Sequence, residues 1–95
     1  MLSEKEILEK LKNVKDPEVG MDIVVLGLIR KITVDDDGVE VLMTLTSPFC
    51  PFADKLVLGV ETEIKKMEGS GDVRVEITFD PPWEPPEEVR AMMQI

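Results

Sequence analysis

The stretch VEVLMTLTSPFCPFADKLVLGVETEIKKM, residues 39–67, contains two hydrophobic periods that are separated by a proline-flanked cysteine. Alternation of period two predicts a β-strand with one buried face, formed by Val39, Val41, Met43 and Leu45. Residues 51–67 have helical spacing, and the buried stripe of that helix would be Ala53, Leu56, Val57, Val60, Ile64 and Met67. A right-handed crossover through this helix would place the following strand parallel to the first.

A second helix is predicted near the start of the chain. Ser3 and Glu6 have the spacing of a capping box, and the apolar residues that follow share one helical face. The helix must end by Lys15 or Asp16, because Pro17 disfavours helical geometry in the residue before it.

Two further strands complete the predicted sheet. Residues 30–35 are joined to residues 39–45 by Asp37-Gly38, a dipeptide typical of the tight turn in a β-hairpin. The third strand has period-two alternation in Val73, Val75, Ile77 and Phe79. Each strand has one apolar face, so we expect the sheet to be covered on one side only.

These elements predict the α+β class: a two-layer sandwich in the order α-β-β-α-β, with a three-stranded mixed sheet covered on one face by two helices. The proline-rich residues 80–86 cannot continue a strand, and a short helix over residues 87–93 would follow them. We expect one domain, residues 1–95, in which residues 80–95 are a C-terminal extension.

Composition excludes several classes of function. The chain carries 20 acidic and 11 basic residues, a net charge of −9, which argues against nucleic acid as a partner because phosphate contacts require Lys and Arg. With one cysteine and no histidine, an internal disulfide, a Cys–His zinc site and a Cys–His catalytic pair are all excluded. Neither a signal peptide nor a membrane-spanning run is evident, and we expect a cytoplasmic protein.

Cys50 has two interpretations, and both stay open at this point. If the helix starts at Pro51, Cys50 is its N-cap, where backbone N–H groups and the helix dipole favour the thiolate that binds metals and attacks electrophiles. Alternatively, Cys50 is an inert core residue, because free cysteine is among the most buried residue types. Thr46 is four residues away and could hydrogen-bond the thiolate or the loop.

The segment DPEVGMD, residues 16–22, brings three carboxylates into a short loop: Asp16, Glu18 and Asp22. One interpretation is local, with Asp16 and Asp22 capping turns of the backbone. The other is a patch of hard oxygen ligands that receives a metal ion. Trp83, the single tryptophan, is either packed over the end of the sheet or an anchor for a partner.

Four segments occur in a characteristic order: DPE at 16–18, DIVVLGLI at 22–29, LTSPFCP at 45–51 and DPPW at 80–83. Together they resemble the PaaD-like, SufT-type family of iron–sulfur cluster assembly proteins, which includes the eukaryotic cytosolic iron–sulfur assembly subunit. The resemblance implies an α+β fold and a role in maturing iron–sulfur proteins. It also implies that Cys50 is the functional cysteine, with Asp16, Glu18, Asp22 and Thr46 at the other motif positions.

The leading hypothesis is therefore an accessory assembly factor, a carrier or adaptor rather than an enzyme, that acts through Cys50. Its cofactor would be a transient iron–sulfur cluster or iron. Its partners would be other assembly proteins and client apoproteins, with no membrane, and with a homodimer as one way to supply further ligands. The alternative is a thiol-based enzyme or redox sensor that uses the same cysteine. An RNA-binding KH domain shares the element order but needs a Gly-x-x-Gly clamp that this chain lacks.

Overall fold

The computed structural model describes residues 2–46 and 51–93, and its elements follow the predicted order. The helices are α1, Glu4–Leu11, α2, Ala53–Lys65, and α3, Glu87–Met93. The strands are β1, Ile29–Val34, β2, Gly38–Met43, and β3, Asp72–Ile77. The predicted α+β class and the sandwich architecture are confirmed.

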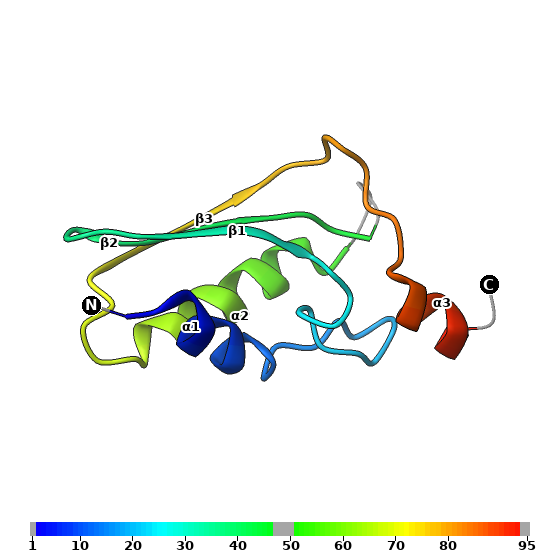
Figure 1. Cartoon of the computed structure of the whole chain (residues 1–95), viewed down its shortest axis with the longest axis horizontal. Coiled ribbons are helices and arrows are strands. Elements are labelled where there is room, and N and C mark those ends of the chain that lie inside the picture. The colour runs from blue at the N-terminus through cyan, green and yellow to red at the C-terminus, as the bar shows by residue number, and fades with distance from the viewer. Residues whose placement is uncertain (1, 47–50, 94–95) are drawn as a thin grey trace.

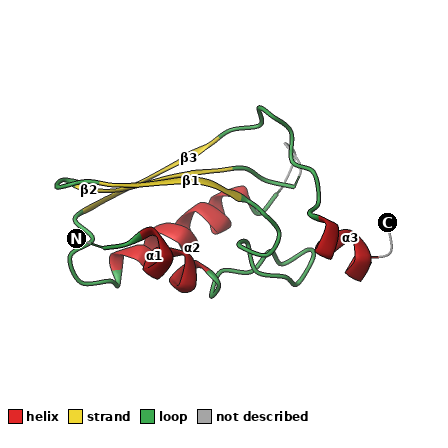
Figure 2. Ribbon diagram, viewed as in Figure 1, coloured by secondary structure: helices red, strands yellow, loops and turns green. Residues whose placement is uncertain are grey.

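The sheet forms one layer, and α1 and α2 lie together beneath it, while α3 lies beyond one end (Figure 1). Figure 2 shows that the opposite face of the sheet has no helix over it. The strand order is β1-β2-β3, with β1 antiparallel and β3 parallel to β2. The mixed sheet that the right-handed crossover predicts is therefore confirmed.

Local sequence explains where the elements begin. The Ser3 Oγ accepts a hydrogen bond from the Glu6 N–H at 3.1 Å, as in a helix N-cap. At the hairpin, one oxygen of the Asp35 carboxylate accepts hydrogen bonds from the N–H groups of Asp37 and Gly38, both at 2.9 Å. The turn is thus held by a side chain as well as by the pairing of β1 with β2.

Several predicted elements are shorter in the structure, among them the strand predicted over residues 39–45, which ends at Met43. The first helix ends at Leu11 rather than at residue 15 or 16, because tight turns redirect the chain so that Lys15 can pair with Asp22. The second helix loses two residues at each end of the predicted 51–67, and the third strand stops at Ile77. Hydrophobic periodicity continues past the last residue that keeps regular hydrogen bonds.

The core is one cluster between the sheet and the two helices. The central strand β2 contributes Val39, Val41 and Met43, and α2 contributes Leu56, Val60 and Ile64, all at most 2% exposed. Of the predicted α2 stripe, Ala53, Val57 and Met67 are only half-buried. Val89 of α3 is 0% exposed and belongs to the same cluster, so the C-terminal segment packs into the core.

Substitution of Val89 by Ala should lower the free energy of unfolding by about 2 kcal/mol, because it removes two buried methyl groups from a fully enclosed site. Met92 lies on the same helix and is 58% exposed, so Met92→Ala is the matched control and should change stability by less than about 0.5 kcal/mol. Urea denaturation followed by circular dichroism measures both. Equal effects of the two substitutions would show that α3 is not docked in solution.

Candidate functional site

Three segments of the chain meet at the end of the sheet where β2 leads into Thr46. Beyond β2 the Thr44 N–H donates to the Leu28 carbonyl at 2.8 Å, and the Thr78 N–H donates to the Met43 carbonyl at 2.8 Å. The segment that precedes β1, the end of β2 and the end of β3 therefore meet at the same place. Figure 1 shows that α2 also starts there.

Cys50 lies outside the described residues, and the structure tests only its flanks. Thr46 is half-buried and Pro51 is exposed. The N-cap of α2 is Phe52, without a side-chain capping bond, and the Phe52 carbonyl accepts the Leu56 N–H at 3.0 Å. The prediction that the helix starts at Pro51 and that Cys50 is its N-cap is therefore wrong by two residues.

Asp16 is 1% exposed and organises the acidic loop from within. Its Oδ1 accepts the Glu18 N–H at 2.8 Å, and its backbone bonds to Met21 and Gly20 across the loop. A buried carboxylate requires such donors, because an unpaired charge is costly away from water. Glu18 is exposed, so its side chain lies at the surface of the loop.

Asp22 closes the other end of the loop. Its Oδ1 accepts hydrogen bonds from the N–H groups of Val24 and Val25, at 2.9 and 2.8 Å. These bonds start the turn that carries Leu26 and Leu28 into the core. The local interpretation of Asp16 and Asp22 as turn caps is thus confirmed. Among residues 2–46 and 51–93 no three potential metal ligands come together, so the metal-binding role of the loop stays a prediction.

The C-terminal segment binds across this end of the molecule. The Trp83 Nε1–H donates to the Leu26 carbonyl at 2.7 Å, and the Arg30 guanidinium donates to the Pro81 carbonyl at 2.7 Å. Gly27 has φ +75°, and a Cβ there would lie 3.2 Å from the Pro86 ring, so the segment depends on glycine at this position. Trp83 is half-buried against the core, in agreement with its interpretation as a packed side chain.

Thr44 is buried although it alternates with the inward-facing residues of β2. Its alternation with Met43 and Leu45 predicts a position on the open face of the sheet, yet its side chain is 0% exposed. Within the part of the chain that the structure describes, its Oγ1 has no hydrogen-bond partner. Strand alternation cannot predict this burial, because it depends on how distant segments meet beyond the end of β2.

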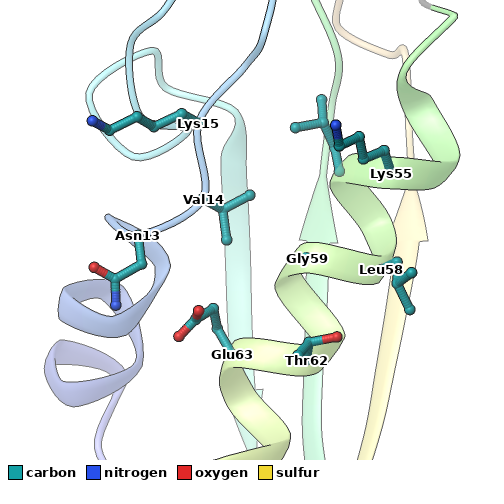
Figure 3. Close-up of a pocket in the computed structure, with 9 residues that line it drawn as sticks. Asn13, Val14, Lys15, Lys55, Leu58, Gly59, Thr62 and Glu63 are labelled. Atoms are coloured by element: carbon teal, nitrogen blue, oxygen red, sulfur yellow. The ribbon is translucent and has the colours of Figure 1, made fainter.

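A groove between residues 13–15 and α2 lies next to the acidic loop. Figure 3 shows Val14 facing Gly59 across this groove, with Lys15 and Lys55 at one end of the view. A Cβ at Gly59 would lie 3.2 Å from Val14. Sequence reasoning did not identify the groove, because its two sides are about 40 residues apart in the chain.

The comparison with known proteins identifies the family. A family model described as "Iron-sulfur cluster assembly protein" matches residues 4–77, more than half of the chain. This chain belongs to that family. The iron–sulfur assembly role that the four segments predict is therefore confirmed, and the matched region contains the acidic loop, Thr46 and Cys50.

Individual relatives agree with this assignment. The chain is 39% identical over 82 residues to the Fe-S protein maturation auxiliary factor of Porphyromonas gingivalis, with 85% of this chain and 78% of that protein covered. It is 46% identical over 69 residues to the Fe-S protein maturation auxiliary factor SufT of Staphylococcus aureus, with coverage of 72% and 78%. A conserved hypothetical protein from Thermotoga maritima has the same fold, with a TM-score of 0.87, 45% identity, and 99% and 96% of the two chains covered.

The capping role of Asp22 predicts a specific effect on stability. Asp22→Ala should lower the free energy of unfolding by about 1 to 2 kcal/mol, because it leaves two N–H groups without their acceptor. Asp22→Asn keeps an acceptor oxygen and should cost less. Glu18→Ala, at an exposed position of the same loop, is the control and should stay within about 0.5 kcal/mol of the wild type in urea denaturation. A larger effect from Glu18 than from Asp22 would contradict the capping role.

Proposed function

We propose that this iron–sulfur assembly protein acts as a carrier or adaptor through Cys50, and that it is an accessory factor rather than an enzyme. The observation that carries the proposal is the family match over residues 4–77, which includes the whole junction between β2 and α2. Cys50, the single thiol of the chain, lies in that junction.

The number of thiols limits the mechanism. Iron–sulfur clusters are normally held by four protein ligands, mostly cysteine thiolates, and one chain supplies a single cysteine. The other ligands must come from a second copy, from a cluster donor or from the client apoprotein. Transfer then proceeds by ligand exchange at iron, in which the Cys50 thiolate bonds as another thiolate leaves, with no change of oxidation state.

The acidic loop is proposed as the place where iron first meets the protein. Asp16 and Asp22 each use one carboxylate oxygen for a turn, whereas Glu18 is at the surface. These three carboxylates with Cys50 are the proposed metal ligands, although the three carboxylates do not converge on one point in this structure. Thr46 is proposed to hydrogen-bond the bound thiolate or sulfide. Hard oxygen ligands suit iron in transit better than a finished cluster, which prefers thiolate.

A thiol-based enzyme or redox sensor is the weaker alternative. The chain has no histidine to act as a general base, and the N-cap of α2 is Phe52 rather than Cys50. We expect assembly proteins and client apoproteins as partners, without nucleic acid, in the cytoplasm. No helix in the described part of the chain is long and apolar enough to cross a membrane.

Anaerobic reconstitution with ferrous iron and sulfide tests the proposal. Wild-type protein should bind iron, show the visible absorbance of a cluster, and transfer that cluster to an apo-ferredoxin. Cys50→Ser should lose both properties and keep its circular dichroism spectrum. If the chain acts only as an adaptor, it will bind no cluster itself, but Cys50→Ser will still abolish its stimulation of ferredoxin maturation by a separate cluster donor.

Two controls complete the experiment. Glu18→Gln should reduce binding of iron alone, and Glu68→Gln, an exposed carboxylate beyond the far end of α2, should not. A Cys50→Ser protein that matures ferredoxin as well as the wild type would refute the role of Cys50. A Cys50→Ser protein that unfolds would make Cys50 a core residue instead.

A further inference from the structure

The edge strand β3 presents unused backbone hydrogen-bonding groups. The Asp72 N–H donates to the Asp37 carbonyl at 3.0 Å, and the Thr78 N–H donates to the Met43 carbonyl, so even-numbered residues direct their backbone groups towards β2. Because successive residues of a strand alternate, Val73, Val75 and Ile77 direct theirs to the free edge. Among the described elements β3 contacts only β2 and α2.

The two edges of the sheet differ in how they resist further pairing. The register of β1 shifts between Ile29 and Lys31, the kind of irregularity that protects an edge. β3 pairs with β2 without any shift, and residues 72–77 contain no proline. The free edge of β3 is therefore a regular template for another strand.

Apolar side chains along β3 are incompletely covered. Val73 and Val75 are half-buried, Ile77 is 36% exposed, and Phe79, just beyond the strand, is 41% exposed. Within the described residues four large hydrophobic side chains are classed as exposed, and two of them are Ile77 and Phe79. A strand added at this edge would cover part of that surface.

We propose that two copies of this chain associate through the free edge of β3, antiparallel across a two-fold axis at Val75. In this register the three outward-facing residues form hydrogen-bonded pairs: Val75 with its own copy, and Val73 with the partner's Ile77. The two three-stranded sheets then become one continuous sheet. An isologous pairing of this kind closes on itself and produces a dimer.

Charge complementarity selects both the occupant and the register. With the axis at Val75, Arg74 lies opposite the partner's Glu76 in the closer, non-hydrogen-bonded pairs, and the same contact occurs twice. An axis at residue 74 would place Arg74 opposite the Arg74 of the other copy. An axis at residue 76 would place Glu76 opposite the Glu76 of the other copy. Both registers bring like charges together. The Arg74 side chain is half-exposed, so its guanidinium is accessible to the partner. Within its own chain the guanidinium lies 3.7 Å from the Glu40 carboxylate and 3.9 Å from the Asp35 carboxylate.

This dimer separates the two cysteine junctions. β2 is parallel to β3, so in an antiparallel pair the ends of the two β2 strands, which lead to Cys50, point in opposite directions. The dimer therefore does not bridge one cluster between its own two cysteines. Under the proposed function, the additional thiolates come from the donor or the client.

Charge reversal tests the proposal. Sedimentation velocity of the full chain, from low micromolar to millimolar concentration at physiological salt, should show a monomer–dimer equilibrium. Arg74→Glu and Glu76→Arg should each raise the dimer Kd by at least about tenfold, because each places two like-charged pairs across the axis. The double variant restores opposite charges and should recover the wild-type Kd. Lys31→Glu, an exposed charge reversal on β1, is the matched control and should leave the Kd unchanged.

Of the two single variants, Glu76→Arg is easier to interpret, because Arg74→Glu also changes the contacts of Arg74 with two acidic groups of its own chain. Circular dichroism checks that each variant is folded. A wild type that stays monomeric throughout would overturn the proposal, whether or not the edge pairs with a client peptide. A dimer insensitive to both reversals, or a double variant that stays dissociated, would equally overturn it. Cys50→Ser should leave the dimer intact, so loss of cluster chemistry and loss of association are separate results.

Discussion

The buried face of β2 is the constraint on which the rest of the molecule depends. β2 is the only strand with a hydrogen-bonded neighbour on each side in the described sheet, and Val39, Val41 and Met43 are at most 1% exposed. Those side chains must be covered, and α2, which follows after a short junction, covers them with Leu56, Val60 and Ile64. Because α2 returns the chain to the end of the sheet where β2 starts, β3 runs parallel to β2. The cysteine junction consequently connects the most buried strand to the helix that buries it.

The acidic loop has a structural role that is compatible with its proposed contact to a metal ion. Asp16 and Asp22 bind the backbone of the loop from inside, and the turn that Asp22 starts leads to the Leu26 carbonyl, to which Trp83 donates. The C-terminal segment therefore rests on a surface that the loop organises. A carboxylate that is already fixed by N–H groups loses little conformational entropy on meeting a cation. Structural capping is thus compatible with the proposed metal contact and would prepare the loop for it.

Patterns that are local in the sequence predicted most of the fold. The alternation around Val41, the helical spacing around Val60 and the hairpin signalled by Asp37-Gly38 each depend on near neighbours, and all three elements are confirmed, although the turn itself lies at Asp36-Asp37 and Gly38 begins β2. The burial of Thr44 and the groove beside Gly59 depend on contacts between segments far apart in the chain. No period or propensity encodes such contacts, so the sequence could identify the cysteine junction but not its geometry.

The single cysteine and the regular edge of β3 both bear on how the protein would exchange a cluster with donors and clients. A protein that held a cluster with its own four thiolates would have to break several Fe–S bonds to release it, whereas a chain with one thiol offers a weak and easily exchanged attachment. If pairing through β3 directs the two junctions away from each other, each Cys50 faces donors and clients independently. Under these two proposals the edge of the sheet would set the assembly state and the junction after β2 would carry out the transfer, so the two functions would belong to different residues of the same small sheet.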